Sequence, residues 1–324
     1  MRRLIALALA LAAVAGCDNK AAGGAKLTIA VIPKGTTHEF WKSVHFGALK
    51  AAKELDVEII WKGPLQENDR QGQINEVEAF INRGVSGICL APLDSKALRK
   101  YASMAMSKKI PVVIFDSGLE GDDYVSYVAT DNYKGGVIAG DHLAKVLGGK
   151  GKVALLRYME GSESTVQREQ GFLDAIARSK EIEVLSSNQY AGATADTALK
   201  ASENLLASLA NPDGGLKIDG LFCPNESSAI GMLRALQTAK LAGKVKFVGF
   251  DSSERIVAAL KSGEMQGTVL QHPIRMGYLA TKAIVTRLRG GAVEKRVDTG
   301  VDLATSENMD TPEMKALLRP EQAP

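Results

Sequence analysis

Four polar side chains stand directly behind short apolar runs, at points typical of the carboxyl ends of strands. They are Asp116 in "VVIFDSG", Asn225 in "GLFCPNESS", Asp251 in "KFVGFDSS" and Gln271 in "GTVLQHP". In open parallel sheets, ligands bind beyond the carboxyl ends of the strands. Asp and Asn after a strand also commonly cap the next helix, which is the structural alternative for each residue taken alone. The recurrence of the pattern at four strand ends favours one ligand cleft.

The chemistry of this set suits a neutral molecule with many hydroxyls. Carboxylates, carboxamides and a guanidinium, from Arg168 in "STVQREQGF", supply fixed acceptors and donors. Because each hydroxyl both donates and accepts a hydrogen bond, a polyol can pair with such a mixture of donors and acceptors. An anionic ligand would need more arginine or a glycine loop. The alternative for Arg168 is a solvated charge on a helix.

Two adjacent aromatic residues, Phe40 and Trp41, follow the loop of "PKGTTHEFWKS". Neighbouring positions on a helix point about 100° apart, so one helix face cannot easily bury both rings. The C–H face of a sugar ring is apolar and packs on an aromatic ring, so we expect these rings at the mouth of the cleft. The alternative places one ring in the core and the other in a contact between lobes.

The chain alternates short β-branched runs with segments that have helical spacing, which predicts the α/β class with parallel sheets covered by helices. The strand candidates are 27–32, 57–61, 87–90, 112–115, 124–128, 153–156, 183–185, 220–223, 245–249, 267–270 and a late one near 297–303. Eleven strands exceed a typical sheet, so we expect two doubly wound lobes joined by a hinge, with the ligand cleft between them. The expected N-terminal lobe spans 27–130 and 272–296, and the C-terminal lobe spans 131–271 and 297–307, followed by a tail at 308–324.

The first residues, "MRRLIALALALAAVAGC", are typical of a secretory signal, with two arginines, an apolar run and small residues before a cysteine. The segment Val14–Cys17 resembles the bacterial lipobox, which implies a signal peptide at 1–16 and lipidation of Cys17. An ordinary cleaved leader is the alternative. Asp18 resembles a signal for retention at the inner membrane, and residues 17–26 are expected to form a flexible tether.

The composition of the chain limits the classes of partner that it is expected to bind. Removing Arg2 and Arg3 from the 40 basic residues leaves 38 against 37 acidic ones, so there is no polybasic signature for nucleic acid. No later apolar run approaches membrane length, so contact with a membrane is expected through the lipid alone. Beside Cys17, only Cys89 and Cys223 remain, each inside an apolar run, which is typical of buried free thiols.

Several blocks of the chain together resemble ribose-binding protein and its relatives, which deliver pentoses and hexoses to ABC importers. The blocks include "FWKSVHFGALKAAKEL", "TDNYKGGVIAGDHLAK", "REQGFLDAI", "LFCPNESSAIGMLRALQTA" and "TVLQHPIRMGYLA", in order from about Lys26 to Glu307. The resemblance implies ligand contacts from the residues already singled out, namely Phe40, Trp41, Asp116, Arg168, Asn225, Asp251 and Gln271. Departures are His38 in place of an asparagine and Ser117 in place of an arginine, and Tyr190 is the candidate for a second-lobe aromatic.

The resemblance also implies how such a protein works. Two lobes joined by three crossings close on a monosaccharide, and an ABC permease in the inner membrane reads the closed form. It implies a monomer in the periplasm or on the extracytoplasmic face, without a cofactor or a metal.

Three other functions remain to be weighed. An enzyme would use Asp116 and Asp251 as an acid and base pair, but no phosphate loop, no G-x-S-x-G elbow and no metal spacing of histidines occurs. A transcriptional regulator with this binding fold would begin with a helix-turn-helix in place of an export signal. The same fold binding an autoinducer or a nucleoside, or serving a chemoreceptor or sensor kinase, is the nearest alternative.

Overall fold

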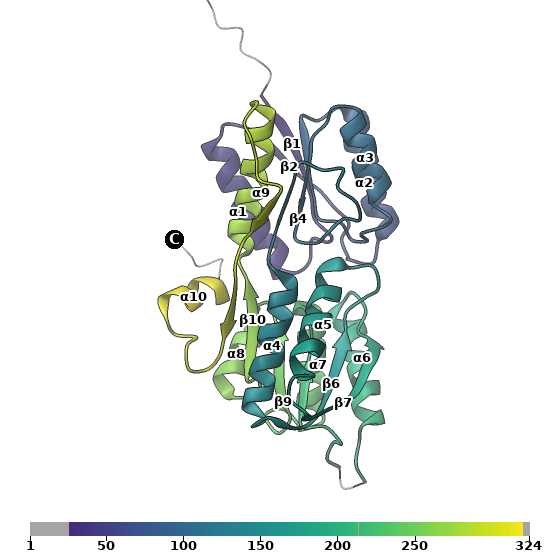
Figure 1. Ribbon diagram of the computed structural model, residues 1–324, viewed down its shortest axis with the longest axis vertical. Coiled ribbons are helices and arrows are strands. Elements are labelled where there is room, and N and C mark those ends of the chain that lie inside the picture. The colour runs from purple at the N-terminus through teal and green to yellow at the C-terminus, as the bar shows by residue number, and fades with distance from the viewer. Residues whose placement is uncertain (1–25, 213, 320–324) are drawn as a thin grey trace, which may run out of the picture.

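Short strands alternate with helices along the chain, as the sequence predicts. The computed structural model describes residues 26–212 and 214–319. Within those residues, twelve strands form two sheets of six, and Figure 1 shows one sheet in each of two lobes. We call the lobe that contains the first strand lobe 1 and the other lobe 2.

The sheet of lobe 1 is entirely parallel, in the order β11-β5-β4-β3-β1-β2. Its strands are β1 (Thr28–Ile32), β2 (Glu58–Trp61), β3 (Gly87–Leu90), β4 (Val112–Phe115), β5 (Ser126–Ala129) and β11 (Arg296–Asp298). Helices α1 (Glu39–Glu54) and α9 (Pro273–Leu288) cover one face, and α2 (Arg70–Arg83) and α3 (Arg99–Ser107) cover the other. Val113 packs in the first of these cores and Ile114 in the second. Both faces are buried, which is why the strands are apolar without alternating.

Lobe 2 repeats this plan with one antiparallel edge strand. Its strands are β6 (Lys150–Arg157), β7 (Glu181–Tyr190), β8 (Gly220–Phe222), β9 (Lys246–Phe250), β10 (Gly267–Gln271) and β12 (Val301–Ala304), in the order β12-β10-β9-β8-β6-β7. Helices α4 (Asn132–Val146) and α5 (Glu163–Ile176) pack on one face. Helices α6 (Ala195–Ser208), α7 (Glu226–Thr238) and α8 (Glu254–Ser262) pack on the other.

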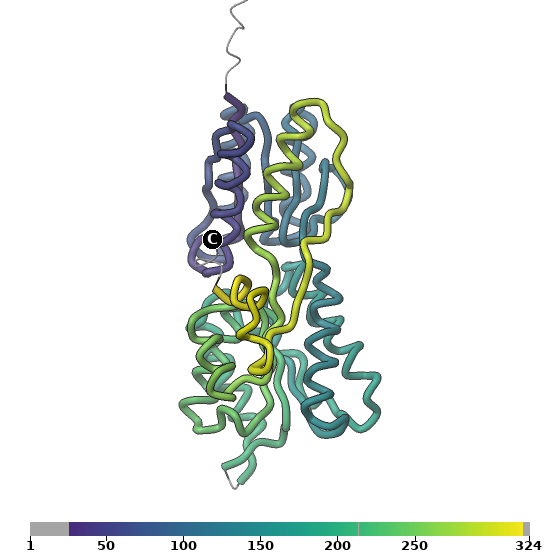
Figure 2. Tube along the Cα trace, turned by 90° about the vertical axis from the view of Figure 1, so that its left-hand side faces the viewer, coloured from purple at the N-terminus to yellow at the C-terminus, as the bar shows by residue number. Residues whose placement is uncertain are grey.

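The chain passes between the lobes three times, between β5 and α4, between β10 and α9, and between β11 and β12. Figure 2 shows α9 rising into lobe 1 and the yellow segment to its right returning to lobe 2. The late strand expected near 297–303 is in fact two strands. Val297 pairs with Val128 in lobe 1, so assigning it to the C-terminal lobe was wrong. The turn at Thr299 and Gly300, where Gly300 has φ 96°, separates β11 from β12.

Residues expected as a C-terminal tail contain a further helix, α10 (Pro312–Leu318). Thr311 caps it by accepting a hydrogen bond from the backbone N–H of Met314. The side chain of Leu318 is buried in the core of lobe 2, and the Ser252 hydroxyl donates to its carbonyl at 2.7 Å. This segment is therefore part of lobe 2.

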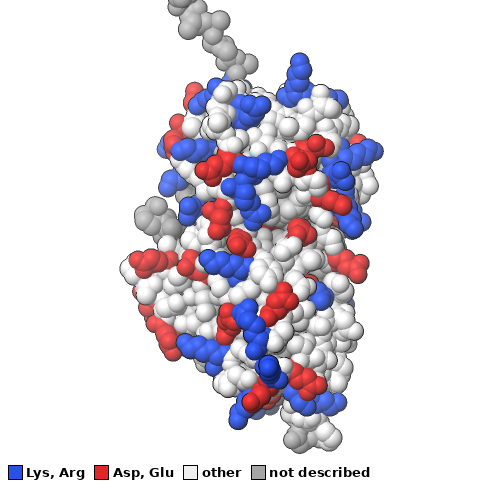
Figure 3. Space-filling model, viewed as in Figure 1, with Lys and Arg blue, Asp and Glu red and all other residues white. Residues whose placement is uncertain are grey.

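Across the described part of the chain, no helix has the length and apolar character that a bilayer crossing needs. Basic and acidic side chains intermingle over the face seen in Figure 3, in keeping with the near balance of charge in the sequence. The proposed signal peptide, Cys17 and most of the tether lie outside the described residues.

Candidate ligand-binding site

The predicted strand-end residues lie where the two lobes meet. Asp116 follows β4 of lobe 1, and Asp251 follows β9 of lobe 2. Both have positive φ, 62° for Asp116 and 68° for Asp251, a conformation that aspartate adopts more readily than most residues. The two lobes therefore turn their chains away from the sheet in the same manner, with a buried carboxylate at each turn.

Asp251 is the centre of a polar cluster in lobe 2. Its Oδ1 accepts a hydrogen bond from Gln271 Nε2 at 2.8 Å, and its Oδ2 lies 3.9 Å from Arg168 Nη1. Burial raises the pKa of Asp251, while the charge of Arg168 and the bond from Gln271 oppose that rise. The structure thus brings together three residues that the sequence placed in one cleft.

Arg168 is buried and is no solvated helix charge. Its Nε donates to Asn132 Oδ1 at 2.8 Å, its Nη1 donates to the Pro224 carbonyl at 2.9 Å, and its guanidinium lies 3.9 Å from the ring centroid of Phe250. A glycine on α4 allows this placement, because a Cβ on Gly136 would lie 2.0 Å from the Arg168 carbonyl. Close contact between α4 and α5 therefore fixes the guanidinium.

Asp116 pairs with a cation that the sequence analysis missed. Lys34, 3% exposed, places its Nζ 3.2 Å from Asp116 Oδ2 and donates to the hydroxyls of Ser162 at 3.1 Å and Ser164 at 2.9 Å. The neighbouring Ser117 accepts a hydrogen bond from the backbone N–H of Ser164 at 3.0 Å. The positive charge beside Asp116 therefore comes from Lys34, just after β1.

Both aromatic rings are buried and lie edge to face, with centroids 4.9 Å apart. Trp41 belongs to the core between the sheet of lobe 1 and its helices α1 and α9, where it also contacts the edge of Phe115. Its indole N–H donates to Glu67 at 2.7 Å. Phe40 is the ring that lines the cavity described below.

His38 forms a buried ion pair with Glu67, with Nδ1 and Oε1 2.8 Å apart. Burial alone would lower the pKa of His38, but the charge and hydrogen bond of Glu67 raise it to about 9. Burial alone would raise the pKa of Glu67, but His38, supported by Lys34 and Tyr158, lowers it to about 2. At neutral pH both groups are therefore charged.

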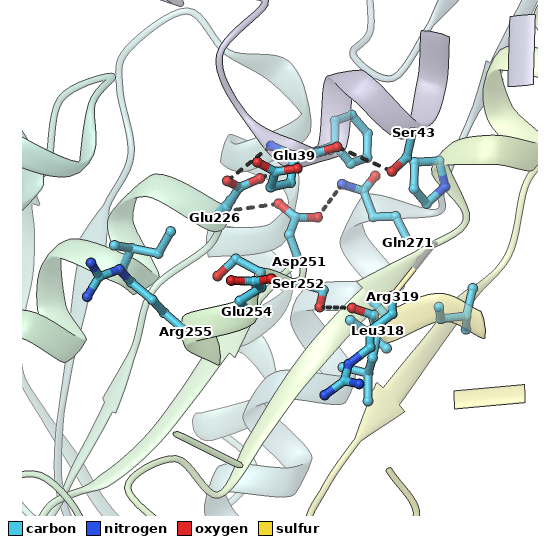
Figure 4. Close-up of a pocket in the computed structure, with 16 residues that line it drawn as sticks. Glu39, Ser43, Glu226, Asp251, Ser252, Glu254, Arg255, Gln271, Leu318 and Arg319 are labelled. Carbon is cyan, nitrogen blue, oxygen red and sulfur yellow. Dashed lines mark hydrogen bonds between the residues drawn. The ribbon is translucent and has the colours of Figure 1, made fainter. Parts of the chain in front are cut away.

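A cavity of about 450 Å³ lies between the lobes, beside this cluster. Of the predicted residues, Phe40, Asp251 and Gln271 line it, together with Glu226, which was not predicted (Figure 4). Gln271 is 3% exposed, and its Oε1 has no hydrogen-bond partner among the residues described. A buried acceptor without a donor is costly, so this oxygen suits a ligand that donates.

Glu226 links the two lobes at this cavity. Its carboxylate accepts hydrogen bonds from the backbone N–H groups of Glu39 and Phe40, each at 3.2 Å, and its own N–H donates to Asp251 Oδ2 at 3.1 Å. Burial raises the pKa of Glu226, the charge of His38 opposes that rise and Asp251 adds to it, which leaves the pKa at about 7.

Two residues predicted for the ligand site do not line the cavity. Tyr190 ends the edge strand β7 and is 44% exposed, and the hydrogen bonds and cavity described above do not include it. Asn225 is buried beside the cluster, but it caps α7, where its Oδ1 accepts from the backbone N–H of Ser228 at 3.2 Å and its Nδ2 donates to the Ser227 hydroxyl at 3.1 Å. The structural alternative thus accounts for its side-chain bonds.

Four residues of the cleft escaped the sequence reasoning, namely Lys34, Glu67, Tyr158 and Glu226. Lys34 and Tyr158 come just after the apolar strands β1 and β6, and Glu226 follows Asn225, so the same strand-end rule would have found them. Glu67 lies in a loop between β2 and α2, and no local pattern marks it.

Comparison with known proteins places this geometry in a family. The sequence profile of the periplasmic binding protein domain matches residues 29–292. The ribose import binding protein of Haemophilus influenzae is 32% identical over 297 residues, which cover 92% of this chain and 97% of that protein.

Two solved structures are also similar in fold and sequence. A carbohydrate transporter solute-binding protein from Agrobacterium radiobacter, solved with D-arabinose, has a TM-score of 0.86 and 36% identity, covering 91% of this chain and 99% of its own. An ABC transporter solute-binding protein from Agrobacterium vitis, solved with D-fucose, has a TM-score of 0.84 and 35% identity, covering 90% and 99%. These proteins bind solutes and are not enzymes, and the predicted two-lobed α/β fold is confirmed. The chain belongs to the periplasmic binding protein family.

Proposed function

We propose that this protein binds a monosaccharide between its lobes and delivers it to an ABC importer. The observation that carries the proposal is the buried set of Asp251, Gln271 and Arg168 beside a cavity that both lobes line. The relatives support a sugar, because the ligands named for them are ribose, D-arabinose and D-fucose.

The polar groups at the cavity favour a neutral ligand with several hydroxyls. Gln271 Oε1 and the carboxylates of Asp251 and Glu226 accept hydrogen bonds, and Phe40 offers an apolar surface to one side. Asp116, Arg168 and Asn225 are buried but do not line this cavity. We include them in the proposed ligand contacts, together with His38, Trp41 and Ser117. Tyr190 stays in the proposed set only for an open form of the cleft.

Closure would supply the signal for transport. A sugar that contacts Asp116 in lobe 1 and Asp251 in lobe 2 stabilises the closed form over the open one, and a permease that reads the closed form accepts only loaded protein. The alternative ligands, an autoinducer or a nucleoside, would give the same movement and are separated from sugars by the binding test.

We also propose that the protein acts on the extracytoplasmic side as a monomer, held to the membrane by lipid on Cys17. Incorporation of labelled palmitate into the wild-type chain, and its loss in Cys17→Ala, would support the anchor. Release of the wild-type protein into the soluble periplasmic fraction would contradict it.

Titration calorimetry with D-ribose, D-arabinose and D-fucose tests the proposed function. We expect at least one to bind with a dissociation constant of about 10 μM or tighter, since several hydrogen bonds of about 1 kcal/mol each and one ring contact together reach about 7 kcal/mol. Absence of binding by all pentoses and hexoses in a wider thermal-shift screen, with binding of a nucleoside, would overturn the sugar assignment.

A further inference from the structure

Glu67, in the loop between β2 and α2, joins the two lobes with one carboxylate. Its Oε1 accepts hydrogen bonds from Trp41 and His38 of lobe 1, at 2.7 and 2.8 Å. Its Oε2 accepts one from the hydroxyl of Tyr158 in lobe 2, at 2.6 Å. Glu67 is 6% exposed and Tyr158 is fully buried, so water does not screen this contact.

Each end of the Glu67–Tyr158 bond is fixed within its own lobe. On the lobe 1 side, a Cβ on Gly35 would lie 2.8 Å from Glu67 Cγ, which shows how closely the two loops pack. On the lobe 2 side, the backbone N–H of Tyr158 donates to Glu169 at 2.9 Å, and Arg157 holds that carboxylate at 2.7 Å. Glu67 and Tyr158 are therefore each held in place by contacts within their own lobe, and the bond connects the two lobes.

The charge of Glu67 and the proton of the Tyr158 hydroxyl favour the Glu67–Tyr158 bond in the closed arrangement of the lobes. His38 keeps Glu67 ionised, and burial together with the negative charge of Glu67 raises the pKa of Tyr158, so the hydroxyl stays a donor. If the lobes part, Glu67 keeps its bonds to His38 and Trp41, and water replaces the hydroxyl. Loss of the hydroxyl would therefore destabilise the closed form selectively, because a buried carboxylate would lose a partner there.

Lys34 makes a second contact of the same kind. Its ammonium leaves β1 of lobe 1 and donates to Ser162 and Ser164 at the start of α5 in lobe 2. Two charged groups of lobe 1 thus form direct hydrogen bonds to hydroxyls of lobe 2.

We propose that Glu67 is a positioning residue that holds lobe 2 through Tyr158, so that the protein populates its closed form before a ligand arrives. The inference rests on the proposed closure, but it does not depend on which ligand binds. A preformed closed population raises the affinity of a ligand that selects it, because less free energy is spent on closing.

The test measures the distance between the lobes in the absence of sugar. Spin labels on Lys100→Cys of α3 and Glu203→Cys of α6 report on one lobe each, because both positions are exposed. The native thiols Cys89 and Cys223 are buried and should not react. Pulsed electron resonance then gives the ratio of closed to open molecules.

Tyr158→Phe is the deciding variant, and Tyr278→Phe is its matched control. The Tyr278 hydroxyl also donates to a carboxylate at 2.6 Å, but its partner Glu54 lies in the same lobe. We expect Tyr158→Phe to lower the ratio of closed to open molecules about tenfold or more, and Tyr278→Phe to leave it within about twofold.

Identical distance distributions for wild type and Tyr158→Phe would overturn the inference, as would a wild-type protein without a closed population when no sugar is present. The addition of D-ribose, D-arabinose or D-fucose to the same labelled proteins tests the proposed function separately. If none of them closes the Tyr158→Phe protein or binds to the wild type, that result counts against the sugar assignment alone, whatever the ligand-free ratio shows.

Discussion

The carboxylate of Glu226 in lobe 2 lies 3.2 Å from the backbone nitrogen of Phe40 in lobe 1. Phe40 stands in the first turn of α1, whose N–H groups lack partners within the helix and carry partial positive charge. Glu226 thus satisfies the start of a helix in the other lobe, at the edge of the cavity that we assign to the ligand. Because this contact joins the two lobes, opening of the cleft would break it, and the charge of Glu226 should affect closure.

Sugar affinity should weaken as the pH rises through neutrality. The pKa of Glu226 is raised from its ordinary value of 4.5 to about 7 by burial between the lobes, and we expect the ordinary value when the cleft opens. An acid whose pKa is raised by closure favours closure below about pH 4.5, and this contribution is lost as the pH rises through about 7. Calorimetry from about pH 5 to about pH 8 should show the decline in wild type and a flatter profile in Glu226→Gln. Glu254→Gln, at an exposed position on the same cavity, should keep the wild-type profile.

Stability should be greatest where His38 and Glu67 are both charged. The raised pKa of His38 gives a contribution that is fully present below pH 6.5 and is lost as the pH rises through about 9. The lowered pKa of Glu67 gives one that is present above pH 4.5 and is lost as the pH falls through about 2. Urea unfolding of His38→Asn should lose the alkaline part of this dependence, while His142→Asn should retain it. An unchanged alkaline limb in His38→Asn would contradict the ion pair.

Asp251→Ala should cost the sugar about 2 kcal/mol or more of binding free energy, roughly a 30-fold loss of affinity. The carboxylate is buried, so its removal takes the hydrogen-bond acceptor from the Gln271 amide and the opposite charge from the Arg168 guanidinium. Calorimetry checks the affinity, and a thermal melt checks that the apo protein still folds. The exposed Asp141→Ala is the control, and equal affinities for the two variants would argue against the site.

Substitutions of the two aromatic residues should have different main effects, one on the stability of the fold and the other on sugar binding. Trp41→Ala removes a ring from the core of lobe 1 and should lower the free energy of unfolding by about 3–5 kcal/mol. Phe40→Leu keeps most of the buried apolar volume but removes the ring surface at the cavity, so it should weaken sugar binding with a smaller loss of stability. Unfolding and calorimetry of both variants decide this, and a Phe40→Leu protein with wild-type affinity would exclude ring contact.

The sequence predicted the fold because strands buried on both faces leave an unmistakable pattern. Apolar runs such as 112–115 and 246–250 alternate with helical spacing, and the strand-end rule led directly to Asp116, Asp251 and Gln271. It did not separate β11 from β12, because one turn at Gly300 sends two short strands to different sheets. Which sheet a short strand joins depends on tertiary contacts and not on its own residues.

The sequence predicted a side chain of the cleft only where its position follows from the end of a single strand. The strand-end rule also applies to Lys34 and Tyr158, but it does not show their hydrogen bonds, because the partners lie in the other lobe. Glu67 is fixed by three partners that are distant in the sequence. Asn225 illustrates the opposite case, because its capping bonds to Ser227 and Ser228 are entirely local and were expected as the structural alternative.

The order of the strands along the chain determines how much of the polypeptide must be synthesised before lobe 1 can fold completely. Lobe 1 takes its edge strand from residues 296–298 and packs one face against α9, yet both elements follow almost all of lobe 2 along the chain. Neither half can be excised as one continuous fragment. The N-terminal half must wait until nearly the entire polypeptide has been made before its sheet is complete, which gives it long-range contacts and slow folding.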